Sequence, residues 1–217
     1  MTPYDPFTAP EYDRAALVTI DVQNDTLAGG SFEVAGTSDI LEPIRHLCQT
    51  FRTAGRPIIH VMRIYTSDAQ DADRCRRASL LAGEKILLKG SAGRRPVDAL
   101  LPSQTIRIDD DLLLSGTPQP IGPDEILMYK PRWGAFYRTP LEALCREKAV
   151  STLVVCGCNF PNCPRTSIYQ ASERDFRITA VTDALSGIMP SDVAALEKIG
   201  ITCASSQTVC EVIESLG

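Results

Sequence analysis

The stretch from residue 151 to residue 187 constrains the fold of this chain more than any other. An apolar run at residues 152–156 is long enough for a buried strand and too short for a helix. A turn rich in Gly, Asn and Pro follows, then a helix-like run at 167–174 and a second strand-like run at 177–181. Strand, helix and strand in this order form a parallel crossover unit. The segment therefore predicts a parallel β-sheet.

The same alternation of strands and helices continues along the rest of the chain. The other strand-like runs lie at residues 15–20, 57–62, 126–129 and 201–204, and the other helix-like runs at 37–54, 97–101, 139–148, 190–199 and 207–216. Residues 106–108 fit a small additional strand. The alternation predicts an α/β protein, a three-layer α/β/α sandwich around a mainly parallel, six-stranded sheet.

The length and composition fit one globular domain over residues 1–217. The chain is 44% hydrophobic and 23% charged, which is ordinary for a globule able to bury a full core. Residues 65–125 form its least regular region, with mixed charges and several glycines. A long irregular segment inside a compact domain is usually functional, so we expect a lid, a pocket wall or an oligomer contact there.

Composition also excludes several classes of partner. A net charge of −5 and the lack of a basic run argue against nucleic acid. No apolar stretch approaches the ~18 residues of a membrane span, and residues 1–12 lack the apolar core of a secretion signal. The eight cysteines are irregularly spaced, unlike a disulfide framework. We therefore expect a cytoplasmic protein with reduced cysteines.

Three reactive side chains each follow a strand-like run: Asp21, Lys130 and Cys163. Ligands of parallel sheets gather at the C-terminal strand ends, so these side chains are expected to meet. Cys163 also stands at a turn-to-helix junction before Pro164, where the helix dipole favours a thiolate. A neighbouring carboxylate accepts the thiol proton, and a lysine lowers the thiol pKa. The alternatives are a buried structural cysteine, a helix-capping Asp and a solvated Lys.

A metal site is a further alternative at the same place. Cys156 and Cys158 fall on one face of an extended chain, near Cys163. A zinc hairpin, however, places two or more residues between its cysteines and needs a fourth ligand. His60 is a second possible partner for Cys163, but strand-like sequence follows it, which favours burial within the sheet.

Four motifs, at residues 17–25, 129–137, 154–163 and 171–184, together resemble the isochorismatase-like cysteine hydrolases. This superfamily includes the nicotinamidases and N-carbamoylsarcosine amidohydrolase. The resemblance implies that Asp21 is the general base, Lys130 the family's lysine and Cys163 the nucleophile. It also implies a cis peptide between Cys158 and Asn159 and an oxyanion hole made by the backbone N–H groups of Asn159 and Cys163.

The chain departs from its relatives around this site. Phe160-Pro161 replaces the more common Thr-Asn or Thr-Asp, and Pro164 replaces a common Val. The positions after the second strand read Met62-Arg63-Ile64-Tyr65 and lack the Asp and His cluster of metal-binding nicotinamidases, so we expect neither metal nor cofactor. The expected pocket residues are Phe160, Trp133, Phe136, Tyr137, Gln23 and Arg63, with Arg132 and Arg165 as further candidates for a polar substrate group. The alternative for each aromatic residue is core packing, and the alternative for the arginines is a solvated or ion-paired surface position.

The sequence thus predicts a metal-independent cysteine amidohydrolase that cleaves an amide, ureido or lactam C–N bond of a small molecule through a thioester on Cys163. The resemblance also implies a homo-oligomer, a dimer or tetramer. Two alternatives stay open. One is another reaction on the same scaffold, such as vinyl ether hydrolysis or redox thiol chemistry, and the other is a non-catalytic binding or interface homologue.

Overall fold

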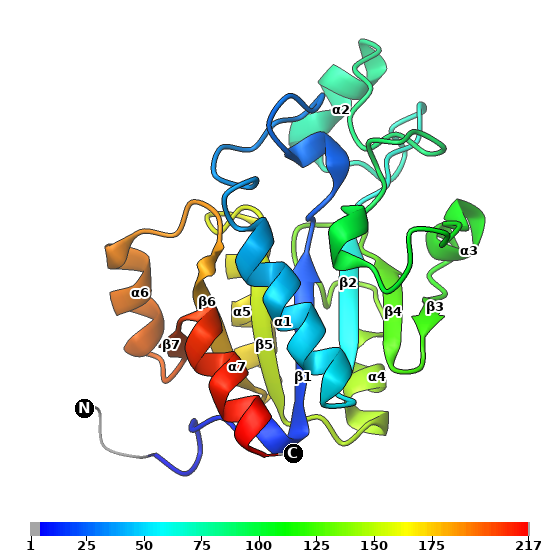
Figure 1. Cartoon of the computed structure of the whole chain (residues 1–217). Helices are drawn as coiled ribbons and strands as arrows, with labels where there is room; N and C mark the ends of the chain where they lie inside the picture. Colours follow the sequence, from blue (N-terminus) through cyan, green and yellow to red (C-terminus); the bar gives the residue numbers. More distant parts are fainter. Residues whose placement is uncertain (1–4, 217) are drawn as a thin grey trace.

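The computed structural model describes residues 5–216 and is built around one seven-stranded β-sheet (Figure 1). Its strands lie in the spatial order β3-β4-β2-β1-β5-β6-β7. All neighbours pair in parallel except β3, which runs antiparallel to β4 at one edge. The strand bounds are β1 (Ala15–Ile20), β2 (Ile58–Met62), β3 (Gln119–Gly122), β4 (Glu125–Tyr129), β5 (Thr152–Gly157), β6 (Arg177–Leu185) and β7 (Thr202–Ala204).

Helices cover both faces of the sheet. As a result, every residue of the central strands β1, β2 and β5 is buried. One face carries α1 (Leu41–Thr53) and α7 (Ser206–Ser215), which pack against each other (Figure 1). The other face carries α4 (Leu141–Glu147), α5 (Cys163–Ser172) and α6 (Pro190–Glu197). The predicted three-layer sandwich is therefore confirmed.

The side chains of β1 show how the layers are held together. Ala15 and Leu17 belong to the apolar cluster under α1 and α7, whereas Ala16, Val18 and Ile20 belong to the cluster under α4, α5 and α6. Helix α1 presents one apolar stripe to the sheet, made by Ile44, Leu47, Cys48 and Phe51. Alternate side chains of the strand thus pack against helices on opposite sides, which gives two apolar cores, one on each face of the sheet.

The sheet has one more strand than the six predicted. The additional strand is β3 at the edge of the sheet. Its Pro120 and Gly122 are typical of turns, so the sequence pattern does not predict a strand there. Residues 106–108 form no strand, and the side chains of Ile106 and Ile108 pack against the apolar cluster beside β4.

The region of residues 65–125 contains more regular structure than the sequence predicts. It holds α2 (Arg74–Leu81), a 3-10 turn at Asp98–Leu100 where a helix was expected, α3 (Asp110–Leu114) and β3. The two other 3-10 turns are Tyr12–Arg14 and Asn24–Thr26. In Figure 1, α2 lies beyond the C-terminal ends of β1 and β2, which places this region over the edge where the reactive residues were expected. Its role as a lid or an oligomer contact stays a prediction.

Candidate active site

Asp21 is the first residue after β1, at the C-terminal edge of the sheet. Its backbone adopts φ 54°, a left-handed conformation that few non-glycine residues take, and its N–H donates to the carbonyl of Val61 on β2. The side chain is buried. This turn directs the carboxylate away from the strand and toward Lys130.

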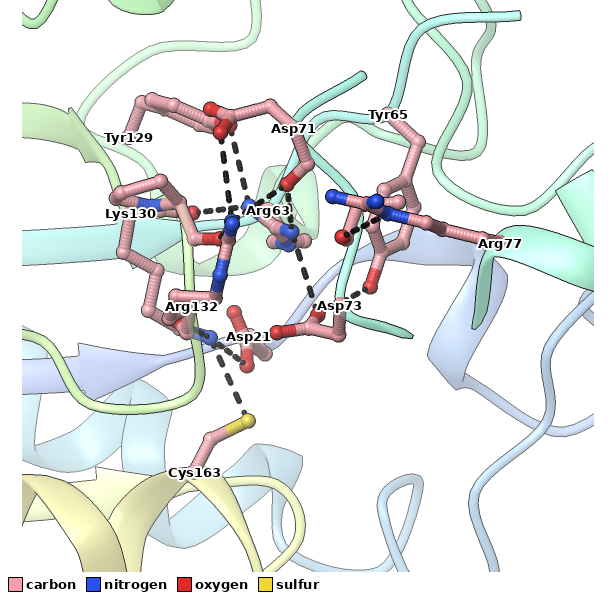
Figure 2. Close-up of polar contacts among 12 residues, drawn as sticks. Asp21, Arg63, Tyr65, Asp71, Asp73, Arg77, Tyr129, Lys130, Arg132 and Cys163 are labelled. Atoms are coloured by element: carbon pink, nitrogen blue, oxygen red, sulfur yellow. Dashed lines mark hydrogen bonds and ion pairs between the residues drawn. The ribbon is translucent and has the colours of Figure 1, made fainter. Parts of the chain in front are cut away.

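Lys130 comes directly after β4 and contacts the other two predicted residues, Asp21 and Cys163 (Figure 2). Its Nζ lies 2.8 Å from Asp21 Oδ2 and 3.4 Å from Cys163 Sγ, and it donates to the carbonyl of Arg132 at 3.2 Å. The side chain is only 1% exposed. Burial is the largest single effect on Lys130 and lowers its pKa, but Asp21 and Cys163 together outweigh it, so the net pKa is raised and the ammonium stays charged.

Cys163 is the first residue of α5, with Asn162 as N-cap and Pro164 in the first turn. Burial is the main effect on its thiol and raises the pKa; Lys130 lowers the pKa, and the Asp21 charge raises it further. The net shift is upward, so the expected thiolate-favouring setting is wrong for this structure. Burial outweighs the lysine, which favours the thiol over the thiolate.

The backbone of the turn before α5 offers free donors. The peptide bond between Cys158 and Asn159 is cis, as the resemblance predicts. Phe160 N–H donates to the carbonyl of Ser186, whereas the N–H groups of Asn159 and Cys163 donate to no acceptor within residues 5–216. Both of these residues line the pocket in front of the thiol. Their N–H groups are therefore available to a bound oxygen atom.

The pocket that contains the three side chains has an empty volume of about 530 Å³, part of it open to solvent. Its lining combines the strand ends with the 26–34 loop and with α2. The lining residues are Asp21, Thr26, Phe32, Val34, Arg63, Tyr65, Asp73, Arg76, Leu87, Lys130, Trp133, Cys158, Asn159, Asn162 and Cys163.

Two of the six expected pocket residues line this pocket. Trp133 is 40% exposed and free to contact a ligand. Arg63 forms part of the wall, but its guanidinium is held by protein groups. It donates to the hydroxyl of Tyr129 and to the carbonyls of Lys130 and Asp71, and it forms an ion pair with Asp73 at 3.2 Å.

The other four expected residues do not line the pocket. Phe160 is 0% exposed and packs in the core under α5, because the bond from its N–H to Ser186 fixes the turn with the ring inward. Phe136 is buried in the same core against Phe176, with ring centroids 5.9 Å apart. Tyr137 is exposed outside the pocket, beside Arg138.

Gln23 is the fourth of these residues and is completely buried. Its amide nitrogen donates to the carbonyls of Arg63 and Arg94, and its carbonyl oxygen accepts from the N–H of Arg63. These bonds tie the loop after β1 to the end of β2. Gln23 therefore supports the site without facing a substrate.

The remaining candidates also have structural partners. Arg132 binds the carbonyl and carboxylate of Asp71, and Arg165 lies 3.7 Å from the carboxylate of Asp192; neither lines the pocket. His60 is buried within the sheet, as expected. Its Nδ1 lies 2.8 Å from the Thr19 hydroxyl and its Nε2 lies 2.7 Å from a Glu125 carboxylate oxygen.

The pocket also contains residues that the sequence analysis missed: Phe32, Tyr65, Asp73 and Arg76. The signal for the last two is weak, because α2 has no regular apolar stripe and buries only Leu80. Tyr65 follows β2 closely, and its position near a strand end would have marked it in the same way as Asp21.

The cysteines near Cys163 are free thiols that contact backbone groups. Cys158 Sγ donates to the carbonyl of Asp21 at 3.2 Å, and Cys156 Sγ donates to that of Val18 at 3.8 Å. Burial, followed by the Asp21 charge, raises the pKa of Cys158 to about 12. Among residues 5–216, no group of three His, Cys, Asp or Glu side chains is arranged to hold a metal ion. None of the helices in that range is long and apolar enough to cross a membrane.

Fold and site together define a doubly wound α/β protein in which a carboxylate, an ammonium and a thiol meet at a strand-to-helix junction. The family model of the isochorismatase domain matches residues 15–204, so this chain belongs to the isochorismatase family. The resemblance seen in the sequence is thereby confirmed.

Relatives of known name cover most of the chain. It is 26% identical to a protein of Arabidopsis thaliana named a probable inactive nicotinamidase, over 89% of this chain and 93% of the relative. It is 26% identical to the ureidoacrylate amidohydrolase RutB of Methylobacterium radiotolerans, over 84% of this chain and 72% of the relative.

Solved structures show the same fold. An isochorismatase family protein from Desulfovibrio vulgaris is 29% identical, with a TM-score of 0.78 over 93% of this chain and 98% of that one. The N-carbamoylsarcosine amidase of Thermoplasma acidophilum is 23% identical, with a TM-score of 0.68 over 89% of this chain and 96% of that one.

Proposed function

We propose that this protein is a metal-independent cysteine amidohydrolase that cleaves an amide, ureido or lactam C–N bond of a small molecule through a thioester on Cys163. Family membership, together with a relative named ureidoacrylate amidohydrolase, supports a hydrolase of C–N bonds other than peptide bonds. The residues after β2 favour a metal-free reaction, because Arg63 with its protein partners stands where metal-binding nicotinamidases carry Asp and His.

The free oxygen of Asp21 is the observation that carries the proposal. Oδ2 of this carboxylate is bound by Lys130, whereas Oδ1 is buried and accepts no hydrogen bond from any group in residues 5–216. A buried carboxylate oxygen without a donor is unusual, because the lack of a partner destabilises the fold. Next to a thiol with a raised pKa, this oxygen supplies the acceptor that the Cys163 proton needs.

The acylation half of the reaction follows from this arrangement. Asp21 takes the proton of Cys163 as the sulfur attacks the substrate carbonyl, which forms the C–S bond and places a negative charge on the carbonyl oxygen. The N–H groups of Asn159 and Cys163 bind this oxyanion. The protonated Asp21 then gives its proton to the leaving nitrogen as the C–N bond breaks, and an acyl-enzyme is left.

The deacylation half uses the same groups. A water molecule loses a proton to Asp21 and attacks the thioester carbonyl. The second tetrahedral intermediate collapses with loss of the thiolate, which recovers its proton from Asp21. Lys130 keeps its charge throughout and stabilises whichever of the two partners is anionic.

Trapping the acyl-enzyme tests the proposal. Small amides, carbamoyl compounds and lactams are incubated with the protein, the reaction is quenched in acid, and intact-mass and peptide mass spectrometry locate any adduct. We expect an acyl adduct on Cys163 and release of ammonia or an amine, both lost in Cys163→Ala and retained in Cys75→Ala, because Cys75 is exposed and outside the pocket.

A different outcome would favour one of the alternatives. Turnover of a vinyl ether without an adduct would indicate another reaction on the scaffold, and the absence of adduct and turnover with the whole panel would indicate a non-catalytic homologue. A homo-oligomer, dimer or tetramer, and a cytoplasmic location stay predictions.

A further inference from the structure

The charges in the pocket wall do not cancel. Three cationic side chains line it, those of Arg63, Arg76 and Lys130, against two carboxylates, those of Asp21 and Asp73. The chain as a whole carries a net charge of −5, so an excess positive charge here runs against the rest of the molecule. A cleft with one uncompensated charge concentrates ligands of the opposite sign.

Four of these five groups are paired with one another. Lys130 Nζ lies 2.8 Å from Asp21, and Arg63 lies 3.2 Å from Asp73. Asp73 accepts a further hydrogen bond from the Tyr65 hydroxyl at 3.1 Å. Each carboxylate is thus neutralised by a cation that is itself nearly or completely buried.

The guanidinium of Arg76 is the group left over. Within residues 5–216 it forms no ion pair and donates no hydrogen bond to the protein. Its central carbon lies 4.3 Å from the centre of the Phe32 ring, and Phe32 is itself part of the pocket wall. The ring positions the cation at the pocket and leaves all its donors available to a ligand.

We propose that Arg76 binds a carboxylate at one end of the substrate while Cys163 attacks the carbonyl at the other end. The substrate class is then a small monoanionic amide or ureide, such as the half-amide of a dicarboxylic acid or an N-carbamoyl acid. A planar guanidinium matches a carboxylate with two parallel hydrogen bonds. The apolar wall formed by Val34, Leu87 and Trp133 fits a short hydrocarbon spacer between the two groups.

This assignment rests on the proposed function for the position of the scissile bond, but its binding half is testable without turnover. Calorimetry on the Cys163→Ala protein compares each anion with the neutral compound of the same shape. The pairs are malonamate with malonamide, succinamate with succinamide, and N-carbamoylglycine with its amide. We expect at least one anion to bind about tenfold more tightly than its partner, with a preference that falls as salt is added.

Substitutions in α2 assign the preference to one residue. Arg76→Gln keeps the side-chain stem on Phe32 and should remove the preference for the anion, whereas Arg76→Lys should keep part of it. Arg74→Gln is the matched control, because Arg74 is exposed on the same helix and lies outside the pocket. Thermal melting of each variant shows whether α2 stays folded.

The outcomes separate this inference from the proposed function. Equal or undetectable binding of all the anions, or an equal loss in Arg74→Gln, overturns the assignment of Arg76 even if Cys163 forms an acyl adduct with a neutral amide. An anion preference that depends on Arg76, in a protein whose Cys163 never acylates, supports the anion site and rejects the hydrolase mechanism.

Discussion

Two buried cations, Arg63 and Lys130, lie close together in space at the C-terminal edge of the sheet, although 67 residues separate them in sequence. Their surroundings differ in one respect. The Arg63 guanidinium, after β2, donates to four oxygen atoms of Tyr129, Lys130, Asp71 and Asp73 and stacks on the ring of Tyr65 (Figure 2). Lys130, after β4, binds Asp21 and the reactive sulfur of Cys163.

The two clusters differ in which of their polar groups lack a hydrogen-bond partner. Around Arg63, each bond ties one segment of chain to another, and within residues 5–216 the buried Nε is the only guanidinium nitrogen without a partner. Around Lys130, the carboxylate keeps a free oxygen and the thiol keeps its proton. A satisfied network of this kind holds a structure rigid, whereas an incomplete one next to a pocket can transfer a proton. The first cluster supports the site and the second is suited to the chemistry.

Replacing each cation by Met should separate the two roles most clearly. In both variants a buried carboxylate loses its partner, so the unfolding free energy should fall by about 3–5 kcal/mol. Lys130→Met should also lower kcat by about 10²–10³, because it removes a charge that contacts the reacting groups. Arg63→Met should lower kcat by less than about tenfold when measured where the protein is folded.

Denaturant unfolding and single-turnover acylation on the same preparations provide the measurement. The comparison fails if Arg63→Met loses as much kcat as Lys130→Met at equal folded fraction, since Arg63 would then act on the chemistry through its bond to the Lys130 carbonyl.

The pH dependence of alkylation should sharpen the same contrast. A thiol whose pKa is raised carries less thiolate at any given pH, so Cys163 should react with iodoacetamide at least about tenfold more slowly at pH 7 than a free thiol such as N-acetylcysteine. Its rate should still be rising above pH 9. Lys130→Met should slow the reaction further, because Lys130 lowers the pKa of this thiol.

Arg63→Met is the matched control and should leave the alkylation profile unchanged. Peptide mass spectrometry distinguishes Cys163 from the exposed Cys75. Faster alkylation of Cys163 than of the free thiol at pH 7 would show a resting thiolate, and Asp21 would then have no proton to accept in the first step.

The sequence predicts the second cluster better than the first. Asp21, Lys130 and Cys163 each follow an apolar run, and the rule that parallel strands end at one edge brings them together without further knowledge. Two of the partners of Arg63, Asp71 and Asp73, come from a segment of mixed charge without apolar periodicity, so neither α2 nor these contacts could be derived. Pro120 and Gly122 hid β3 in the same way.

Aromatic residues show a second limit of the sequence, since composition does not say which way a ring points. Phe160 lies three residues before Cys163 and Trp133 three residues after Lys130, yet the first ring lies in the core and the second in the pocket wall. The direction depends on tertiary hydrogen bonds, such as that from Phe160 N–H to Ser186, which no local pattern contains.

Substituting these two aromatic residues should give the smallest effects and complete the comparison between support and contact. Phe160→Leu shortens a fully buried side chain, so it should lower the unfolding free energy by about 1–2 kcal/mol and leave KM unchanged. Trp133→Ala removes a 40% exposed side chain from the pocket wall, so it should raise KM about fivefold and change stability by less than about 1 kcal/mol. Steady-state kinetics and denaturant unfolding are measured on both variants. A rise in KM for Phe160→Leu at unchanged stability would show that Phe160 contacts the substrate. A ring that lies only in the core can affect KM only by changing the core packing, and such a change would also lower the unfolding free energy.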